Sequence, residues 1–364
     1  MDKNIYEILN KIEKCGFEAY IVGGYVRDYL LGIKSYDIDI CTNALPKDIA
    51  KIFIGNVSNI NYGSYKLTFN NYNFDITTYR RELEYTNRRP TKIEYTSNLL
   101  LDIERRDFTM NTIIMNKKGE IIDLLGGIND IQNKKIKCVG NVDNKLKEDP
   151  LRILRAIRFA ITLNFSLDKE LLSAIKRNKK LINTLSYQRK RSELDKILAS
   201  KYVIKGINLL KKLDLLSMLE IKVKKLVLVD DLAGMYAQIE VSDNYPFTKT
   251  EKNNIEKIKK IVKYGKIDNY ILFNEGLYLS SVAGIILGKT RIQVAKKYET
   301  LPIKSRKDLE ITTTEIENIL SINKNQLKDI IDTLINLILN NKLKNTNEDL
   351  VKYLQNNKWR YHNE

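Results

Sequence analysis

The chain has 364 residues, of which 43% are hydrophobic and only five are proline, a composition typical of a globular protein with two or three domains. It carries 62 Lys and Arg against 45 Asp and Glu, and the resulting net charge of +17 suits a polyanionic partner, although a general Lys-rich bias would also produce it. The single histidine, His362, lies among polar residues, which excludes histidine-ligated metal sites, Ser-His-Asp triads and histidine-based phosphohydrolase sites.

Membrane and disulfide chemistry are also disfavoured. No stretch contains eighteen consecutive apolar residues, so no membrane span is expected. The first residues, MDKNIYEILNKIEKCGF, are charged throughout and lack the apolar core of a signal peptide, which favours a cytoplasmic protein. Cys15, Cys41 and Cys138 are too far apart to indicate a disulfide framework or a zinc knuckle. Any metal would therefore be held by carboxylates, which favours a hard ion such as Mg²⁺.

The expected elements alternate up to about residue 140 and are mainly helical afterwards. Hairpin turns are expected at NNYN and NKKGE, residues 70–73 and 116–120, so the sheet should be mixed. From Asp149 onward almost every segment has helical periodicity, and the sequence therefore predicts an α+β fold with an all-α remainder. Strands are expected at 19–22, 37–41, 65–69, 74–79, 112–116 and 120–123, and helices at 3–14, 25–31, 46–54 and 97–105.

Two aspartates, Asp37 and Asp39, lie at i and i+2 in one expected strand. Side chains with this spacing point the same way, so the two carboxylates should project together. Such a pair repels unless a cation lies between its members, and Mg²⁺ bridging to phosphate oxygens meets that need. The alternative is an edge strand with two solvated aspartates. Asp75, on the next strand, is a candidate third carboxylate that would activate an attacking hydroxyl, but capping or pairing with a nearby arginine is equally open.

A glycine turn lies upstream in IVGGYVRDYLLG, residues 21–32. Gly23 and Gly24 would let the backbone approach a ligand closely, next to the start of an expected helix. Arg27 would clamp the charge of the ligand. The glycine turn and the two aspartates together predict a site for a nucleoside triphosphate.

Three motifs carry a resemblance to a known family. GGYVRDYLLG followed by DID, RRDFTMN (105–111) and EDPLRILRAIRFA (148–160) resemble, in that order, the signature motifs of the class II tRNA nucleotidyltransferases. That family belongs to the polymerase-β-like nucleotidyltransferase superfamily and includes bacterial poly(A) polymerases. A weaker fourth motif, SYQRKRSELDKIL, has Gln188 where a glutamate is usual, and Thr112 stands where a small alanine is typical.

The resemblance implies an order of parts, a cofactor and substrates. Residues 1–140 would form the catalytic head, 141–200 a helical neck that selects the base, 201–270 a body, and 271–364 a tail that binds tRNA. The substrates would be tRNA, CTP and ATP, and the cofactor Mg²⁺, held by Asp37 and Asp39. The nucleotide would be bound by Gly23, Gly24, Arg27, Arg106, Asp149, Arg152, Arg155 and Arg158.

The neck motif also has a physical interpretation. Asp149 and Arg152 are expected at i and i+3 of one helix, as neighbours on one face. An ionised aspartate only accepts hydrogen bonds and an arginine only donates them. Cytosine and adenine offer an amino group beside an unprotonated ring nitrogen and match the pair, whereas guanine and uracil do not. Each mismatch would leave polar groups unpaired at about 1–3 kcal/mol. The alternative is an exposed helix start with solvated arginines.

Some roles stay open in the sequence. In RRDFTMN, Arg106 is favoured as the ligand, while Arg105, Asp107 and Asn111 are expected to support it. AGIILGKT, residues 283–290, matches a loose phosphate-loop pattern but is expected to be a buried helix that ends at a glycine. The tyrosines of the helical remainder are expected to pack between helices rather than to stack on RNA; they are Tyr264, Tyr270 and Tyr278.

The leading functional hypothesis is stepwise addition of C, C and A to the 3′ end of tRNA by two-magnesium chemistry. A CC-adding enzyme would lack the loop that RRELEYTNRRPTKIEYT provides here, whereas an A-adding enzyme would keep it. A poly(A) polymerase usually has a longer basic C-terminal extension. A non-catalytic RNA-binding module would not need the carboxylates and the neck pair.

Overall fold

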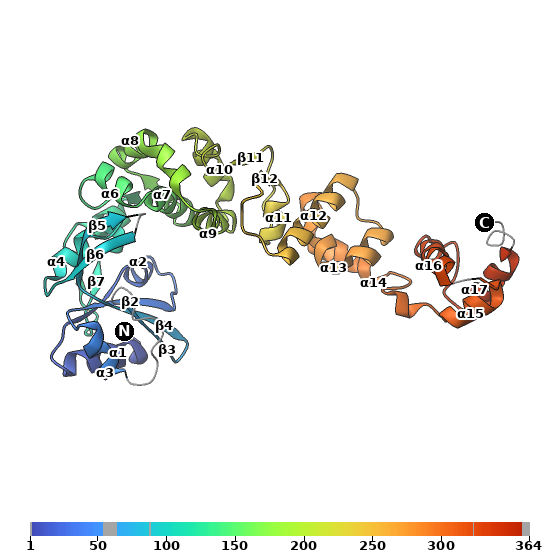
Figure 1. Cartoon of the computed structure of the whole chain (residues 1–364), viewed down its shortest axis with the longest axis horizontal. Helices are drawn as coiled ribbons and strands as arrows, with labels where there is room; N and C mark the ends of the chain where they lie inside the picture. The colour runs from blue at the N-terminus through green and yellow to red at the C-terminus, as the bar shows by residue number, and fades with distance from the viewer. Residues whose placement is uncertain (1, 54–63, 87–88, 323, 359–364) are drawn as a thin grey trace. The chain divides into compact units, whose positions relative to one another are not determined.

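The structure is a computed structural model, shown in Figure 1, that describes residues 2–53, 64–86, 89–322 and 324–358. Its residues fall into two compact units. The first consists of Met1–Ile221 with Ser242–Tyr245, and the second of Lys222–Val241 with Pro246–Glu364. The division into head, neck, body and tail inferred from the resemblance stays a prediction.

A six-stranded sheet organises the start of the first unit. Its strand order is β3-β4-β2-β1-β7-β8. Strands β2 and β4 are parallel and the other neighbours are antiparallel, so the sheet is mixed, as predicted. The strands are β1 (Ala19–Val22), β2 (Asp37–Thr42), β3 (Ser64–Phe69), β4 (Tyr72–Thr78), β7 (Ile114–Met115) and β8 (Ile121–Ile122).

Alternation along β2 separates the core from the functional face. Ile38 and Ile40 are buried, whereas Asp37 and Asp39 point to the opposite, open face. Helix α1 (Lys3–Lys14) buries its apolar stripe, Ile5, Ile8, Leu9 and Ile12, in the core of this unit. The sheet is further accompanied by α2 (Gly24–Leu30), α3 (Pro46–Ile52) and α4 (Leu99–Glu104).

Both expected hairpin turns are present. Asn70 and Asn71 have φ of 44° and 69°, the left-handed pair that a two-residue turn between β3 and β4 requires. Asn116 N–H donates to the carbonyl of Glu120 at 3.1 Å and closes the turn between β7 and β8.

The segment expected to be a loop is a hairpin instead. Strands β5 (Arg80–Thr86) and β6 (Arg89–Tyr95) form an antiparallel pair with two register shifts. Leu83 and Tyr85 alternate with charged residues, which is the sequence signal of a strand. The loop expected at residues 80–96 therefore contains two paired strands in the residues described.

The rest of the first unit is mainly helical, and α7 packs against α9 and α10. Its elements are η2 (Thr109–Asn111), α5 (Gly127–Gln132), β9 (Lys135–Ile136), α6 (Val142–Glu148), α7 (Leu151–Thr162), β10 (Ser166–Leu167), α8 (Lys169–Asn178), η3 (Lys179–Thr184), α9 (Tyr187–Leu198) and α10 (Val203–Lys212).

In its described residues, the second unit is helical apart from one short strand pair, which agrees with the predicted all-α remainder. Helix starts at Thr248 and Thr290 carry capping boxes, which satisfy the first N–H groups. The elements from residue 221 onward are β11 (Ile221–Val223), α11 (Leu232–Tyr236), β12 (Ile239–Val241), α12 (Lys249–Tyr264), α13 (Asn269–Ile286), α14 (Arg291–Glu299), η4 (Arg306–Asp308), α15 (Thr313–Leu320), α16 (Lys324–Leu339) and α17 (Asn347–Asn356). Among the described residues, no helix is long and apolar enough to cross a membrane.

Two expectations for this unit had different outcomes. The first four residues of AGIILGKT are the end of α13, and Gly288 follows the helix at φ 81°, so the rejection of a phosphate loop is confirmed. Tyr264, Tyr270 and Tyr278 are 50%, 56% and 53% exposed, so the expectation that they pack between helices was wrong. The hydroxyls of Tyr264 and Tyr278 donate to Asp268 and Asp231, each at 2.7 Å.

Candidate active site

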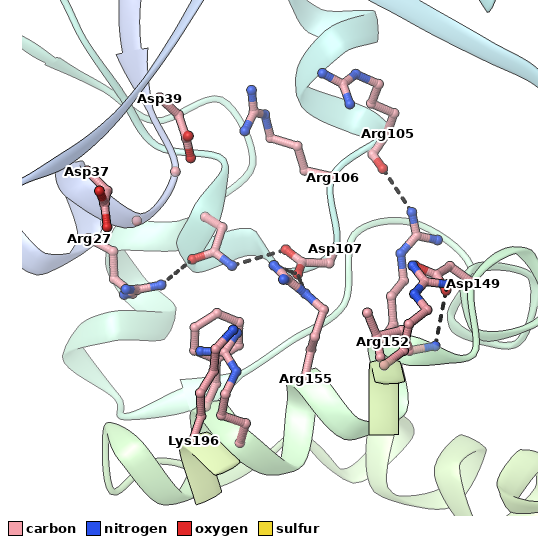
Figure 2. Close-up of a pocket in the computed structure, with 17 residues that line it drawn as sticks. Arg27, Asp37, Asp39, Arg105, Arg106, Asp107, Asp149, Arg152, Arg155 and Lys196 are labelled. Carbon is pink, nitrogen blue, oxygen red and sulfur yellow. Dashed lines mark hydrogen bonds and ion pairs between the residues drawn. The ribbon is translucent and has the colours of Figure 1, made fainter. Parts of the chain in front are cut away.

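A pocket of about 760 Å³ lies within the first unit (Figure 2). Eight basic side chains and four aspartates line it, so the pocket favours a polyanion. The lining residues are Gly23, Gly24, Arg27, Asp37, Asp39, Arg105, Arg106, Asp107, Asn111, Asp149, Leu151, Arg152, Arg155, Arg158, Phe159, Arg189 and Lys196.

The pocket brings together every residue that the sequence assigned to it except Asp75. The turn before α2, strand β2 and the 105–111 segment form one side, and helices α7 and α9 form the other. The sequence did not assign pocket roles to Phe159, Arg189 or Lys196.

Asp37 and Asp39 project from one face of β2, as predicted. Asn73, on β4, donates to Asp37 Oδ1 at 3.1 Å. Desolvation raises the pKa of Asp39; Arg106 opposes this effect, while Asp75 and Asp37 add to it. A cation would relieve this repulsion, so the pair fits a divalent metal that also takes oxygens from a substrate. Within the described ranges, no group of three or more His, Cys, Asp or Glu side chains is placed to hold a metal.

The turn before the helix approaches these carboxylates very closely. Gly23 has φ 83°, a conformation that disfavours any residue with a side chain. A Cβ at this position would lie 3.1 Å from Asp39 Oδ2 and 3.6 Å from Arg106 Nη1. Glycine is therefore required here both by the backbone angle and by the available space.

Asp75 lies directly opposite Asp39 on the neighbouring parallel strand. Its Oδ1 accepts hydrogen bonds from the hydroxyls of Ser64 and Thr77, and its side chain does not line the pocket. These contacts hold the carboxylate beside the Asp37/Asp39 pair.

A chain of hydrogen bonds connects the turn with the neck, as the dashed lines in Figure 2 show in part. Arg27 Nη1 donates to Asn111 Oδ1 at 2.7 Å, and Asn111 Nδ2 donates to Asp107 Oδ1 at 3.0 Å. Arg155 Nε then donates to Asp107 Oδ2 at 2.7 Å. Burial alone would raise the pKa of Asp107, but Arg155 and Asn111 hold it below its ordinary value. Asp107 thus pairs with Arg155 on helix α7.

The two arginines of RRDFTMN share a different carboxylate. Arg105 Nε and Arg106 Nη2 donate to Asp102, on α4, at 2.8 and 3.2 Å. The guanidinium of Arg106 lies beside Asp39, and its buried Nε has no partner among the described residues. Asp102 is wholly buried and was not singled out in the sequence.

The neck pair differs from its expected geometry. Asp149 has an extended backbone and precedes α7, because a residue before proline avoids the helical region. Its Oδ1 accepts from Leu151 N–H at 3.1 Å and from Arg189 Nη1 at 3.4 Å. Arg152, on the first turn of α7, donates to the carbonyls of Lys145 and Arg105 at 2.8 and 3.1 Å. The expectation that both residues lie within one helix was wrong, although both line the pocket.

Three arginines of the pocket lie over one buried aromatic ring, that of Phe159. Phe159 is buried, with 5% of its surface exposed, and it lines the pocket. Guanidinium carbons lie above its ring, with centroid distances of 3.8 Å for Arg158, 5.0 Å for Arg27 and 5.5 Å for Arg155. Arg158 also donates to Glu193 at 2.6 Å. Burial lowers the pKa of Arg158 despite the pairing with Glu193.

Comparisons with known proteins agree with this pocket. Residues 19–137 match the Poly A polymerase head domain, and residues 164–222 match the probable RNA and SrmB-binding site of polymerase A. The chain is 31% identical to the CCA-adding enzyme of Ligilactobacillus salivarius over 347 residues, which cover 86% of each protein. It is 34% identical to the CCA-adding enzyme of Lactobacillus delbrueckii subsp. bulgaricus, over 84% of this chain and 85% of that protein.

Solved structures show the same fold. The crystal structure of Bacillus stearothermophilus CCA-adding enzyme in complex with CTP has a TM-score of 0.87 at 24% identity and covers 99% of both chains. Thermotoga maritima CCA-adding enzyme complexed with tRNA_CCA has a TM-score of 0.69 at 20% identity, over 97% of this chain and 94% of that chain. A nucleotidyltransferase head followed by an RNA-binding region is the class that fold and pocket define.

The chain belongs to the CCA-adding enzyme family of tRNA nucleotidyltransferases, as the motifs predicted. Enzymes of this family generally depend on divalent metal ions.

Proposed function

We propose that this chain adds C, C and A to the 3′ end of tRNA from CTP and ATP without a nucleic acid template and releases pyrophosphate. The observation that carries the proposal is one pocket lined both by the Asp37/Asp39 pair and by the Asp149/Arg152 pair. The first pair suits nucleotidyl transfer and the second suits selection of a base. A cytoplasmic location fits these substrates.

The transfer occurs on the strand side of the pocket. Asp37 and Asp39 would hold Mg²⁺, which when bound stabilises charge on the attacking and leaving oxygens. The 3′-hydroxyl of tRNA attacks the α-phosphorus, the bond to the β-phosphate bridging oxygen breaks, and pyrophosphate leaves. Asp75 is the proposed acceptor of the hydroxyl proton, supported by its position opposite Asp39.

The triphosphate is held by arginines that the head and neck supply together. Gly23 leaves space for a phosphate group next to Asp39, since no side chain occupies that position. Arg106 Nη1 lies next to this space, 3.6 Å from the position that a Cβ at Gly23 would take. Arg27, Arg155 and Arg158 converge above Phe159 and supply further positive charge. Guanidinium groups suit phosphate oxygens because they donate two hydrogen bonds in parallel.

Base selection occurs on the neck side. Hydrogen bonds to Oδ1 orient Asp149, and its Oδ2 accepts none from the residues that the structure describes, which leaves an acceptor for an amino group. Arg152 is fixed by two backbone carbonyls and by Glu148, and donates toward a ring nitrogen. Cytosine and adenine fit this acceptor and donor, whereas uracil and guanine would leave groups unpaired. Each unpaired group costs about 1–3 kcal/mol, or roughly tenfold to a hundredfold in selectivity.

The proposal is tested with the purified chain, Mg²⁺ and three tRNA transcripts that end before CCA, after C or after CC. CTP and ATP are supplied singly and together, and the products are resolved at single-nucleotide length. We expect growth to CCA, no use of GTP or UTP, and loss of activity in Asp37→Ala. Asp48→Ala is the matched control, because Asp48 is a head aspartate outside the pocket.

Other outcomes would assign another activity. Addition of A to the CC-ended transcript alone would indicate an A-adding enzyme, and addition that stops after CC would indicate a CC-adding one. Long A tails would indicate a poly(A) polymerase. No extension of any transcript would leave a non-catalytic RNA-binding module.

A further inference from the structure

Asp102 is a charged residue in the interior of the head. It lies on α4 with no exposed surface, and it does not line the pocket. A buried carboxylate is strongly unfavourable unless it is paired and hydrogen-bonded. Its partners therefore show what it does.

Those partners are two arginines and one backbone group. Oδ1 accepts from Arg105 Nε at 2.8 Å and from the Arg80 N–H, at the start of β5, at 3.3 Å. Oδ2 accepts from Arg106 Nη2 at 3.2 Å. Both guanidiniums keep some solvent contact, so the carboxylate is the fixed point to which they are tied.

The bond to Arg106 acts on the phosphate side of the pocket. It occupies Nη2 and leaves Nη1, which would lie 3.6 Å from a Cβ at Gly23, on the side of the guanidinium that faces the space beside Asp39. Without Asp102, this long side chain would lose the contact that fixes its rotamer.

The bond to Arg105 acts on the base-reading side. The side chain of Arg105 is tied to Asp102, and its backbone carbonyl accepts from Arg152 Nη2 at 3.1 Å. A shift of this backbone would therefore move the guanidinium that meets the base.

We propose that Asp102 is a positioning residue for both sides of the nucleotide pocket: it holds Arg106 for the triphosphate and, through Arg105, holds Arg152 for the base. This inference rests on the proposed function. It predicts that one buried carboxylate outside the pocket controls both affinity for phosphates and choice of base.

The test compares Asp102→Asn with the wild-type full-length chain. The substitution keeps the side-chain shape and removes the charge, and both arginines can be hydrated. We expect kcat/KM for CTP and ATP to fall by about 10- to 100-fold, as misplaced binding groups produce. The preference for CTP over UTP should fall about tenfold. Binding of inorganic tripolyphosphate, measured by calorimetry without tRNA, should also weaken.

Asp130→Asn is the matched control. Asp130 is likewise a buried head carboxylate, on α5, but it accepts from the hydroxyl of Thr109 at 2.6 Å, which is a neutral donor outside the pocket. The Asp130→Asn variant should bind tripolyphosphate with wild-type affinity and should keep the wild-type preference for CTP over UTP. A loss of stability in Asp102→Asn with wild-type preference and wild-type tripolyphosphate affinity would overturn the proposal, because a purely structural residue behaves that way.

A second variant keeps the test decisive if Asp102→Asn does not fold. Arg105→Gln removes the guanidinium that joins Asp102 to the Arg105 backbone, and Arg106 stays bonded to Asp102. We expect a reduced preference for CTP over UTP, and an unchanged preference would overturn the proposal. If the wild type extends no transcript, the proposed function fails, but tripolyphosphate binding still reports whether Asp102 positions Arg106.

Discussion

On the head side of the pocket, Asp37 and Asp39 come from one strand, and Gly23 comes from the turn before α2, the helix that precedes this strand. On the neck side, each arginine depends on a distant segment: Arg152 on the carbonyl of Arg105, and Arg155 on Asp107, 48 residues away. The head side is thus set largely by local backbone geometry, and the neck side by tertiary contacts. Substitutions on the two sides should therefore affect the enzyme differently: those on the head side should lower kcat, and those on the neck side should lower the selectivity for the base.

The largest effect is expected on the head side, to which the chemical step is assigned. Asp39→Asn removes one of two carboxylates on β2, and we expect kcat to fall about a thousandfold or more for CTP and ATP alike, since metal binding stabilises the transition state by several kcal/mol. Single-turnover extension of a CC-ended transcript by ATP, and of a transcript without CCA by CTP, measures this. A loss confined to one nucleotide would show that the head also selects bases.

The next effect should fall on selectivity alone. Asp149→Asn replaces an acceptor with an amide that can donate, which suits the carbonyl of uracil. We expect the ratio of kcat/KM for CTP over UTP to fall by roughly tenfold to a hundredfold. Binding of tripolyphosphate should stay at the wild-type level, because the arginines above Phe159 are untouched. A proportional loss for every nucleotide would contradict the separation of the two sides.

A smaller effect is expected for two glycine substitutions, which together separate the cost of backbone strain from the cost of a side chain that approaches Asp39. Gly23→Ala and Gly32→Ala both place a side chain at positive φ, at 83° and 70°, and each should lower the free energy of unfolding by about 1–2 kcal/mol. Only the methyl group added by Gly23→Ala would meet Asp39, whereas nothing lies within 4 Å of a Cβ at Gly32. Denaturant unfolding should show similar losses, and extension assays should show lost activity in Gly23→Ala alone.

The smallest effect concerns how much the charge of Asp39 destabilises the folded protein. The folded-state pKa of Asp39 lies above its ordinary value of 3.8, so the ionised group disfavours folding. This unfavourable contribution is absent below pH 3.8, grows as the pH rises toward the raised pKa, and is complete above it. In chelator, Asp39→Asn should therefore be slightly more stable than the wild type at neutral pH, and the difference should vanish in acid. Thermal unfolding across pH measures this.

What could be predicted from the sequence follows the same division between local geometry and tertiary contacts. The bounds of α1 and β1, and the shared direction of Asp37 and Asp39, follow from periodicities that a short segment contains. The position of Asp149 outside α7 was missed because the restraint of the following proline was not applied. The roles of Asp102 and Phe159 were missed because each depends on arginines that only the tertiary fold brings together.

The three guanidiniums above Phe159 have a consequence for turnover. Like charges gathered over one apolar ring bind whichever polyanion is available, and released pyrophosphate carries the same oxygens as the incoming triphosphate. If these arginines hold the triphosphate as proposed, the product will compete with each new nucleotide. The rate of successive additions in a cell then depends on how quickly other enzymes hydrolyse pyrophosphate, so a pyrophosphatase would act as an accelerator of this protein without touching it.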